Sequence, residues 1–248
     1  MNDVTICIPV YNKFNLTKLC LEQLFSTKQF NRGFNLIICD DGSTEEHFNE
    51  YLRKLECNLL VHETNQGFVK SVNDMLKEVK TKYFVLMNND VLVHENWLDK
   101  LLEPLDKNEQ VGISSLYGRW DEKDNMISAT FECAAIRTVI LEKITHLDVV
   151  YGTGYYDDED FCLNAKILGW QIDYPRLTKL LIEHFGGQTF GKAREELLRK
   201  NVKIFIKKWY PLFQTSAIVK QHMLNLFNPF NNKPGFSEEE IQEIAEQG

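Results

Sequence analysis

Short apolar runs alternate with segments of helical periodicity through the N-terminal part of the chain. The runs VTICIPV (4–10), NLIICD (35–40), NLLVHE (58–63) and YFVLM (83–87) are rich in Val, Ile and Leu and have the length of buried strands. Between them, residues 15–26 and 68–79 place apolar side chains three and four positions apart, as amphipathic helices do. The alternation predicts right-handed β-α-β units and an α/β fold, with a mostly parallel sheet covered by helices on both faces.

The second half of the chain has a less regular pattern. Residues 95–105 and 157–170 are expected to form helices, and residues 111–118, 127–136 and 180–185 strands. A short helix is expected at 137–144 and a longer one, of mixed charge, at 194–210. From Asn228 onward the composition is polar, so we expect this end of the chain to be peripheral.

Polar side chains follow each of the first four predicted strands. Ligands of a parallel sheet bind beyond the carboxyl ends of its strands, so these side chains should meet at one edge. Each cluster alone is more often a turn, because Asn, Asp and Gly are common turn residues, but four in succession favour a binding site. The residues are Tyr11 and Asn12, Asp40 and Asp41, Asn65 and Gly67, and Asn88, Asn89 and Asp90.

The composition limits the class of protein and its partners. The 248 residues are 44% hydrophobic, which is enough for a packed core, and the formal net charge of −8 makes nucleic acid an unlikely partner. The six cysteines form no CxxC pair, which indicates a reducing compartment. No apolar run approaches the roughly 20 residues of a membrane-spanning helix. We therefore expect a cytoplasmic protein without a transmembrane segment, with the basic helix at 194–210 as a means of approaching a membrane surface.

Two further sequence features concern chemistry at one site. Asp157, Asp158, Glu159 and Asp160 are more acids than a helix start needs, and their mutual repulsion should raise the pKa of at least one carboxyl, as suits a general base. His184 alone is more often a hydrogen-bonded core residue than a ligand, but imidazole and carboxylate together suit Mn²⁺.

The segment GGQTFGKA (186–193) matches a phosphate-binding loop at Gly186, Gly191 and Lys192. Ala193 stands where that loop needs a Ser or Thr hydroxyl for Mg²⁺, and no apolar strand ending in Asp follows it. We therefore interpret the match as chance.

Six motifs, in order and spacing, resemble those of the family 2 inverting glycosyltransferases, which have the GT-A fold. They are VTICIPVYNK, IICDDGST, ETNQGFVKSVN, VLMNNDV, YDDEDFCLNAKILGW and IEHFGG, from about residue 3 to residue 190. The resemblance implies a catalytic domain at 1–212, with a nucleotide-binding half at 1–92, a donor and acceptor half at 93–192 and a helix at 193–212. A C-terminal helical extension would follow at 213–248.

The resemblance also implies roles for individual residues. The first two motifs of the family bind the nucleotide, the third lies near the ribose or diphosphate, and the fourth binds the metal that bridges the diphosphate. The implied cofactor-binding residues are Pro9, Tyr11, Asn12, Asp40, Asp41, Asn65, Gly67, Asn88 and Asn89, and the implied metal ligands are Asp90 and His184. Asn88 replaces an Asp of the family pattern, and its amide oxygen ligates with less charge. The implied cofactors are Mn²⁺ or Mg²⁺ and a UDP- or dTDP-sugar.

The acidic motif of the family supplies the catalytic base. Aligned on Phe161 and Cys162, it places the base at Asp158, with Asp157 and Asp160 as the neighbours that take its place if the register differs by one. The implied reaction is a single displacement with inversion. The hydroxyl of a glycan, lipid-linked or other acceptor attacks the sugar while Asp158 takes its proton, and the metal neutralises the leaving diphosphate.

Two other function classes are weighed against a transferase. A catalytically idle nucleotide-sugar-binding module is the first, because Asn88 weakens the metal site. A nucleotidyltransferase on a similar sheet is the second, but it should carry an early glycine-rich basic segment, and residues 9–20 contain no glycine.

Overall fold

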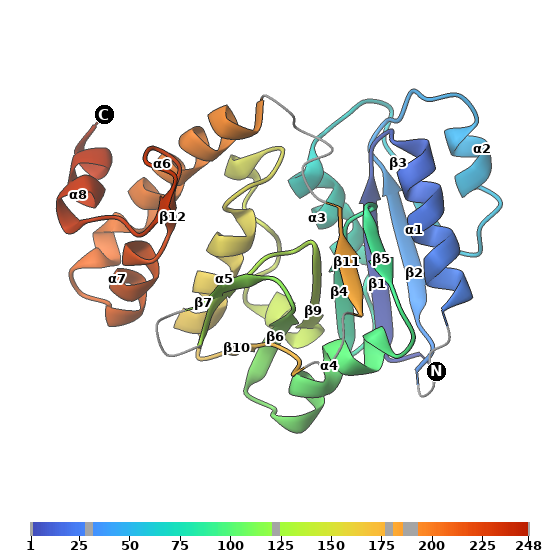
Figure 1. The fold of residues 1–248 in the computed structure, drawn as a ribbon, viewed down its shortest axis with the longest axis horizontal. Coiled ribbons are helices and arrows are strands. Elements are labelled where there is room, and N and C mark those ends of the chain that lie inside the picture. The colour runs from blue at the N-terminus through green and yellow to red at the C-terminus, as the bar shows by residue number, and fades with distance from the viewer. Residues whose placement is uncertain (1, 28–31, 121–124, 177–180, 186–192, 248) are drawn as a thin grey trace.

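A seven-stranded sheet with helices on both faces forms the centre of the protein (Figure 1). The computed structural model describes residues 2–27, 32–120, 125–176, 181–185 and 193–247. In sheet order the strands are β10 (Gln171–Asp173), β6 (Val111–Ser115), β9 (Cys133–Arg137), β4 (Tyr83–Met87), β1 (Val4–Val10), β2 (Asn35–Asp40) and β3 (Asn58–Val61). Strand β9 runs antiparallel to both its neighbours, and the other pairs are parallel. The predicted α/β fold with a mostly parallel sheet is confirmed.

Alternation along the central strands builds one core on each face of the sheet. Val4, Ile6 and Ile8 of β1 enter the core that contains α1 (Phe14–Ser26), α2 (Phe48–Leu52) and α4 (Trp97–Lys107), whereas Cys7 enters the opposite core. That second core contains α3 (Phe68–Glu78) and α5 (Asp157–Ile167). Side chains of a strand point alternately to either side of the sheet, and here those on both sides are apolar, so both faces are buried.

Residues 127–136 form two strands where one was expected. Strand β8 (Met126–Ala129) pairs with β7 (Gly118–Trp120) in a small separate sheet, whereas β9 pairs with β4 and β6. The chain has to change sheets between these strands, so residues 130–132 form a turn. After β9 the expected helix is replaced by two 3-10 helices, η1 (Thr138–Glu142) and η2 (Val149–Tyr151).

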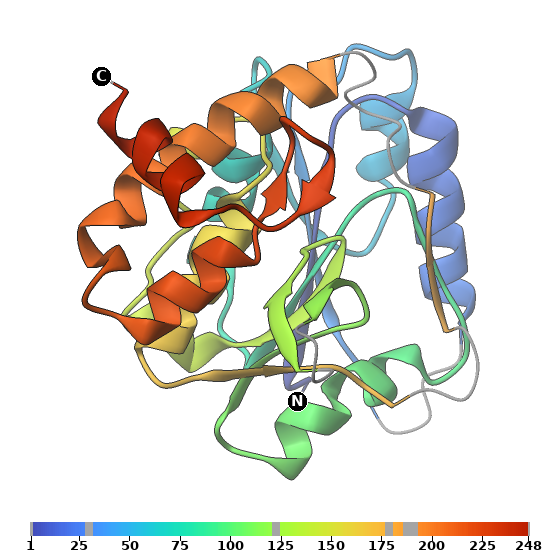
Figure 2. The same ribbon diagram turned by 60° about the vertical axis from the view of Figure 1, so that its left-hand side comes forward.

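The C-terminal segment packs against the rest of the chain. It comprises α6 (Ala193–Phe213), α7 (Ala217–Leu224), the hairpin of β12 (Phe227–Asn228) and β13 (Lys233–Pro234), and α8 (Glu238–Glu246). These elements lie together beside α5 (Figures 1 and 2). Val219, Met223 and Ile241 are fully buried in the core that also contains Phe161 of α5. After Asn228, Phe236, Ile241 and Ile244 are buried whereas Phe230 is 39% exposed, so this polar stretch contributes to the core although it lies at one side of the molecule (Figure 1).

Three expectations from the sequence concern the cysteines, membrane-spanning helices and the segment that resembles a phosphate-binding loop. All six cysteines are unpaired thiols. Among the described residues, no helix has the length and hydrophobicity that crossing a bilayer requires. Residues 186–192, which carry most of the phosphate-loop-like sequence, lie outside the described residues, and Ala193 begins α6.

Candidate active site

A cavity of about 370 Å³ opens where β1, β2 and β4 end. Its apolar floor and polar rim are typical of small-molecule sites. Six residues that the sequence implied for the donor line it, namely Pro9, Tyr11, Asp41, Asn65, Gly67 and Asn88. The other lining residues are Val10, Phe68, Ser71 and Thr153, none of which the sequence motifs singled out.

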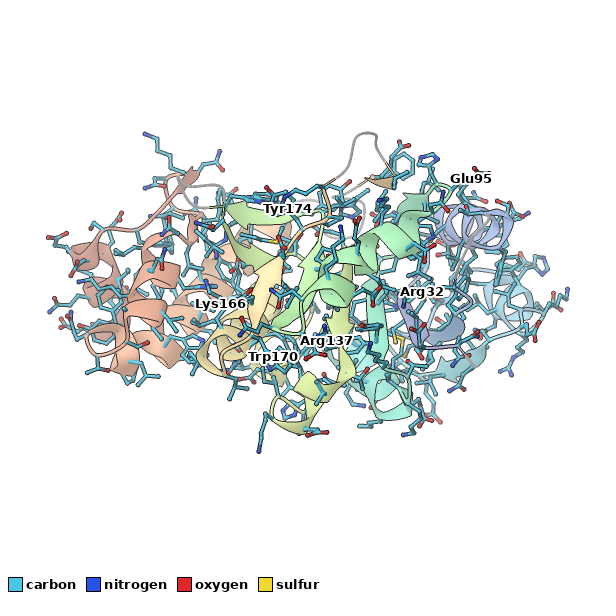
Figure 3. The ribbon with its side chains drawn as sticks, turned by 90° about the horizontal axis from the view of Figure 1, so that it is seen from below. Arg32, Glu95, Arg137, Lys166, Trp170 and Tyr174 are labelled. Atoms are coloured by element: carbon cyan, nitrogen blue, oxygen red, sulfur yellow. The ribbon has the colours of Figure 1, made fainter. Side chains whose placement is uncertain are left out.

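Larger hollows lie elsewhere among the described residues, and those of about 970, 700 and 500 Å³ are not lined by a residue implied for the donor or the metal. The first lies at the amino ends of β1 and β2 around Arg32. The guanidinium there is already paired with Asp3 at 2.7 Å and with Asp99 at 3.4 Å. The second lies at the amino ends of β2 and β3, and the third includes Trp170 and Tyr174 beside β10. Arg32, Trp170 and Tyr174 all appear in the view from below (Figure 3).

Asp41 holds one wall of the cavity in place. Its Oδ1 accepts hydrogen bonds from His62 Nδ1 at 2.7 Å and from the backbone N–H of Gln66 at 2.8 Å, and its Oδ2 accepts from the N–H of Gly67 at 2.8 Å. Gly67 has φ 92°, and a Cβ there would lie 3.2 Å from the carbonyl oxygen of Gly152. Glycine is therefore required both by the backbone conformation and by the close approach of the facing loop.

Asp40 and Asn12 do not line the cavity. Asp40 is fully buried, with Oδ1 accepting from the N–H of Ser43 at 2.9 Å and Oδ2 without a hydrogen-bond partner. Asn12, at φ 53°, accepts from the N–H of Thr44 at 2.8 Å, and its own N–H donates to Ser43 Oγ at 2.7 Å. Asn12 thereby ties the loop after β1 to the loop after β2.

The residues implied for the metal meet at a second short sheet. Strand β11 (Ile182–His184) pairs antiparallel with β5 (Val91–Val93), which brings His184 beside Asp90. Nε2 of His184 lies 3.1 Å from Oδ1 of Asp90, an oxygen that is buried and has no well-oriented hydrogen bond. Asn88 lines the cavity next to them. Asn89 instead donates through Nδ2 to Thr17 Oγ1 of α1 at 2.7 Å, so it supports the turn from behind.

Glu132 belongs to this corner, although no sequence motif pointed to it. It lies on the turn before β9, with Oε1 4.0 Å from His184 Nδ1 and with Oε2 buried and unpartnered. Burial alone would lower the pKa of His184, but contact with Asp90 and the charges of Asp90 and Glu132 raise it. The sequence gives no signal for Glu132, because the single strand expected at 127–136 conceals the turn on which this residue lies.

The described residues do not form a complete metal centre. Within the ranges that the structure describes, no three His, Cys, Asp or Glu side chains are grouped closely enough to hold a metal ion. Asp90 and His184 nevertheless offer a hard oxygen and an imidazole nitrogen, and Asp90 Oδ1 is an orphaned acceptor. Mg²⁺ and related ions commonly take one or two protein ligands and complete their shell with substrate phosphates and water. The pair therefore fits a metal that binds together with the donor.

The four acids at the start of α5 have separate environments. Asp160 is engaged in the core, where Oδ1 accepts from Trp209 Nε1 at 2.8 Å and Oδ2 from Lys208 Nζ at 2.8 Å. Glu159 is paired with Arg119, whose Nε donates to Oε1 at 2.6 Å. Neither carboxylate is available to an acceptor.

Asp157 and Asp158 are the two acids of this cluster that form no ion pair with any residue the structure describes, and the pKa of each is raised. Asp157 is buried, and this burial, with the charges of Asp160 and Glu132, raises its pKa to about 7. Burial and the charges of Asp157, Glu159 and Glu132 raise the pKa of Asp158 well above its ordinary value. Asp158 is half-buried, and within the described residues its Oδ1 accepts from the N–H of Glu159 at 2.8 Å. Asp158 is thus the least buried of the four acids.

Comparison with known proteins bears on this arrangement. The family model described as glycosyl transferase family 2 matches residues 5–161. An uncharacterized glycosyltransferase of Rickettsia bellii is 27% identical over 128 residues, covering 51% of this chain and 18% of the relative. Glycosyltransferase GlyG of Streptococcus pneumoniae is 23% identical over 125 residues, covering 49% and 41%. The alignments thus span less than half the length of these curated relatives.

Solved structures show the same architecture. The mannosyltransferase PcManGT from Pyrobaculum calidifontis, in complex with GDP-Man and Mn²⁺, superposes with a TM-score of 0.71 at 17% identity, covering 92% of this chain and 71% of that one. TarS 1–349 of S. aureus, in complex with UDP-GlcNAc, has a TM-score of 0.60 at 14% identity, covering 98% and 70%. These likenesses establish the GT-A fold. Since the family model covers more than half of the residues, the chain belongs to glycosyl transferase family 2.

Proposed function

We propose that the protein transfers a sugar from a UDP- or dTDP-sugar to an acceptor hydroxyl with inversion at the anomeric carbon. The observation that carries the proposal is the convergence of six implied donor residues on one cavity. A metal-type pair, Asp90 and His184, and the acid pair Asp157 and Asp158 accompany that cavity, with Glu132 electrostatically linked to both pairs.

The donor nucleotide is proposed to occupy the cavity. Tyr11, 39% exposed at its rim, offers a ring to the nucleotide base, and Asn65 and Asn88 offer amides to the ribose and diphosphate. Asp41 acts here mainly by fixing the Gln66 and Gly67 amides, because both its oxygens already accept hydrogen bonds. Asp40, Asn12 and Asn89 support the same loops without lining the cavity.

The divalent metal is proposed to be held by Asp90 and His184, with the remaining positions taken by the diphosphate and water. When bound, it supplies positive charge to the leaving diphosphate. Nε2 of His184 and Oδ1 of Asp90 lie 3.1 Å apart, a separation that two adjacent ligands of one divalent ion can keep.

Asp158 is proposed to take the proton of the acceptor hydroxyl. A carboxylate with a raised pKa is the stronger base once it is ionised, which suits a hydroxyl whose own pKa lies far above 7. Glu159 and Asp160 are engaged in the core, and with Asp158 as the base and no covalent sugar–enzyme intermediate the proposed reaction is a single displacement with inversion. A glycan, a lipid-linked molecule or another hydroxyl compound is the acceptor class. The teichoic acid poly(glycerol phosphate) polymerase of Staphylococcus epidermidis, 33% identical over 95 residues, is consistent with a hydroxyl-rich polymer.

We further propose a cytoplasmic site of action, because six unpaired thiols suit a reducing compartment. The alternative of an idle nucleotide-sugar-binding module has one observation in its favour: within the described residues, no third His, Cys, Asp or Glu side chain joins Asp90 and His184 closely enough to complete a metal site.

The test is release of nucleotide diphosphate from a panel of UDP-, dTDP- and GDP-sugars with Mn²⁺, Mg²⁺ or EDTA. Wild type should release it in a metal-dependent way, Asp158→Asn should lose turnover but still bind UDP, and the anomeric configuration of the product should be inverted. Glu95→Gln is the matched control, because that exposed carboxyl lies on the underside of the molecule (Figure 3).

Equal turnover in wild type and Asp158→Asn would refute the assignment of the base. Binding of UDP without turnover of any donor would favour the idle module. Preference for GDP-sugars would refute the proposed pyrimidine donor.

A further inference from the structure

Two residues outside the sequence motifs, one part-buried and one fully buried, hold the carboxylate next to Asp158. Arg119 of β7 donates through Nε and Nη2 to the two oxygens of Glu159. Nε2 of His222, on α7, lies 2.9 Å from the same carboxylate, and its ring is fully buried and stacked on Phe205 of α6 with 5.7 Å between ring centroids. Nη1 of Arg119 also donates to the carbonyl of Asn225, just after α7. The first turn of α5 is therefore anchored to the C-terminal helices.

A second set of contacts anchors the loop that leads into that turn. Tyr155 and Tyr156 have φ 69° and 68°, a left-handed conformation that costs a non-glycine residue energy and persists only when its surroundings enforce it. Nδ2 of Asn201, buried on α6, lies within 3.1 Å of the carbonyl oxygens of Tyr151, Gly154 and Tyr155. The hydroxyl of Tyr156 donates to the carbonyl of Phe227 at 2.8 Å. Both strained residues are thus held by elements after residue 193.

We propose that Arg119, His222 and Asn201 are positioning residues for the base, so that the C-terminal helices form part of the active-site construction. The inference rests on the proposed function in taking Asp158 as the base. The inference goes beyond the proposed function because it assigns a catalytic contribution to the C-terminal helices. The family model ends at residue 161 and does not include them.

The charges in the network follow from its geometry. Burial would raise the pKa of Glu159, but the charge of Arg119 and the hydrogen bonds from His222 and Arg119 hold it below its ordinary range, so Glu159 is ionised. Burial lowers the pKa of His222 to about 4, so its ring is neutral at pH 7 and donates from Nε2. The ionised Glu159 then acts with Asp157 and Glu132 to raise the pKa of Asp158. The network thus controls both the place and the basicity of Asp158.

Two substitutions separate these effects. In Glu159→Gln the negative charge beside Asp158 is lost, so the acidic limb of the kcat/KM profile should move to lower pH by about one unit, the size expected for one neighbouring like charge. In His222→Leu the charge on Glu159 stays but its anchor to α7 is lost, so kcat should fall roughly 10- to 100-fold through misplacement of the base. The Kd for UDP should stay the same in both, because neither residue lines the cavity.

Matched variants keep the test specific. His222→Gln retains an N–H that reaches Glu159 and should recover most of the lost kcat. Lys220→Gln, which removes the ion pair of α7 with Glu238 and the cation–π contact with Phe213 but leaves the contacts of Glu159 in place, should behave as wild type. Urea unfolding confirms that each variant is folded at the assay temperature, and carboxyl ¹³C titration reports the pKa of Asp158 without requiring turnover.

The results distinguish failure of the inference from failure of the proposed function. Full activity in Asp158→Asn, or no turnover of any donor by wild type, refutes the proposed function. An inactive Asp158→Asn together with unchanged kcat in His222→Leu refutes the positioning role. An unchanged Asp158 titration in Glu159→Gln refutes the electrostatic part, whether or not the protein turns over a donor.

Discussion

Replacing Asp157 with Asn is expected to stabilise the fold at pH 8 and to leave it nearly unchanged in acid. Asp157 is 3% exposed, and burial, with Asp160 and Glu132, raises its pKa from 3.8 to about 7. The folded state therefore holds this proton at pH values where the unfolded chain has released it. Wild-type stability consequently falls as pH rises from about 3.8 to about 7, which is the reverse of the usual behaviour of a salt-bridged carboxylate.

The magnitude follows from that difference in pKa. Roughly three pH units at about 1.36 kcal/mol each correspond to about 4 kcal/mol, and hydration of the ionised helix start reduces this to about 2 to 4 kcal/mol. Asparagine keeps a side-chain oxygen for the backbone amides but never ionises. The substitution also removes the repulsion between the charges at positions 157 and 158, which further stabilises the fold at pH 8.

The assay is urea unfolding of wild type, Asp157→Asn and the control Glu95→Gln at pH 5 and pH 8. The advantage of Asp157→Asn over wild type should be larger at pH 8, and Glu95→Gln should show no such dependence. An advantage of the same size at both pH values would refute the reasoning, because it would mean that Asp157 titrates alike in the folded and unfolded chain.

Three further predictions concern the cavity and its acids. Asp90→Ala should weaken donor binding and abolish the difference between Mn²⁺ and EDTA in nucleotide release; undiminished metal dependence would mean that residues 88–90 are only a turn. Gly67→Ala, at φ 92° and with the Gly152 carbonyl 3.2 Å from the new Cβ, should cost about 1 to 3 kcal/mol of stability and raise the Kd for UDP, as calorimetry would show. The kcat/KM of wild type should rise with pH along a limb far above 3.8, because Asp158 acts only when ionised and its pKa is raised; a limb near pH 4 would contradict this.

Periodicity and strand-end polarity predicted the parallel strands β1 to β4 and the residues that follow them, whereas β10 was not predicted and β9 was merged with β8. The strands VTICIPV and YFVLM alternate between two cores, so their pattern follows from local sequence, and Tyr11, Asp41, Asn65 and Asn88 follow directly from where such strands end. Within the cluster at 88–90, the sequence did not predict which side chain would face the cavity and which would face away from it. Asn88 lines the cavity and Asn89 bonds Thr17, a difference set by the contact between two remote elements.

Residues brought in by tertiary contacts left no pattern in the sequence. Glu132 reaches His184 only because β9 is inserted antiparallel between β4 and β6, and His222 reaches Glu159 only because α7 packs on α5. Four acids in a row indicated a functional helix start, but which of them would be neutralised depended on Arg119, Lys208 and Trp209, far away in the chain.

The loop after β2 supplies an internal anion to helix α1. The carboxylate of Glu45 accepts hydrogen bonds from the backbone N–H groups of Lys13 at 2.9 Å and Phe14 at 2.7 Å. Free amides at the start of a helix are a common phosphate-binding site. Here the Glu45 carboxylate occupies the position that a phosphate would take. Inorganic phosphate should therefore bind poorly to these two amides at the start of α1.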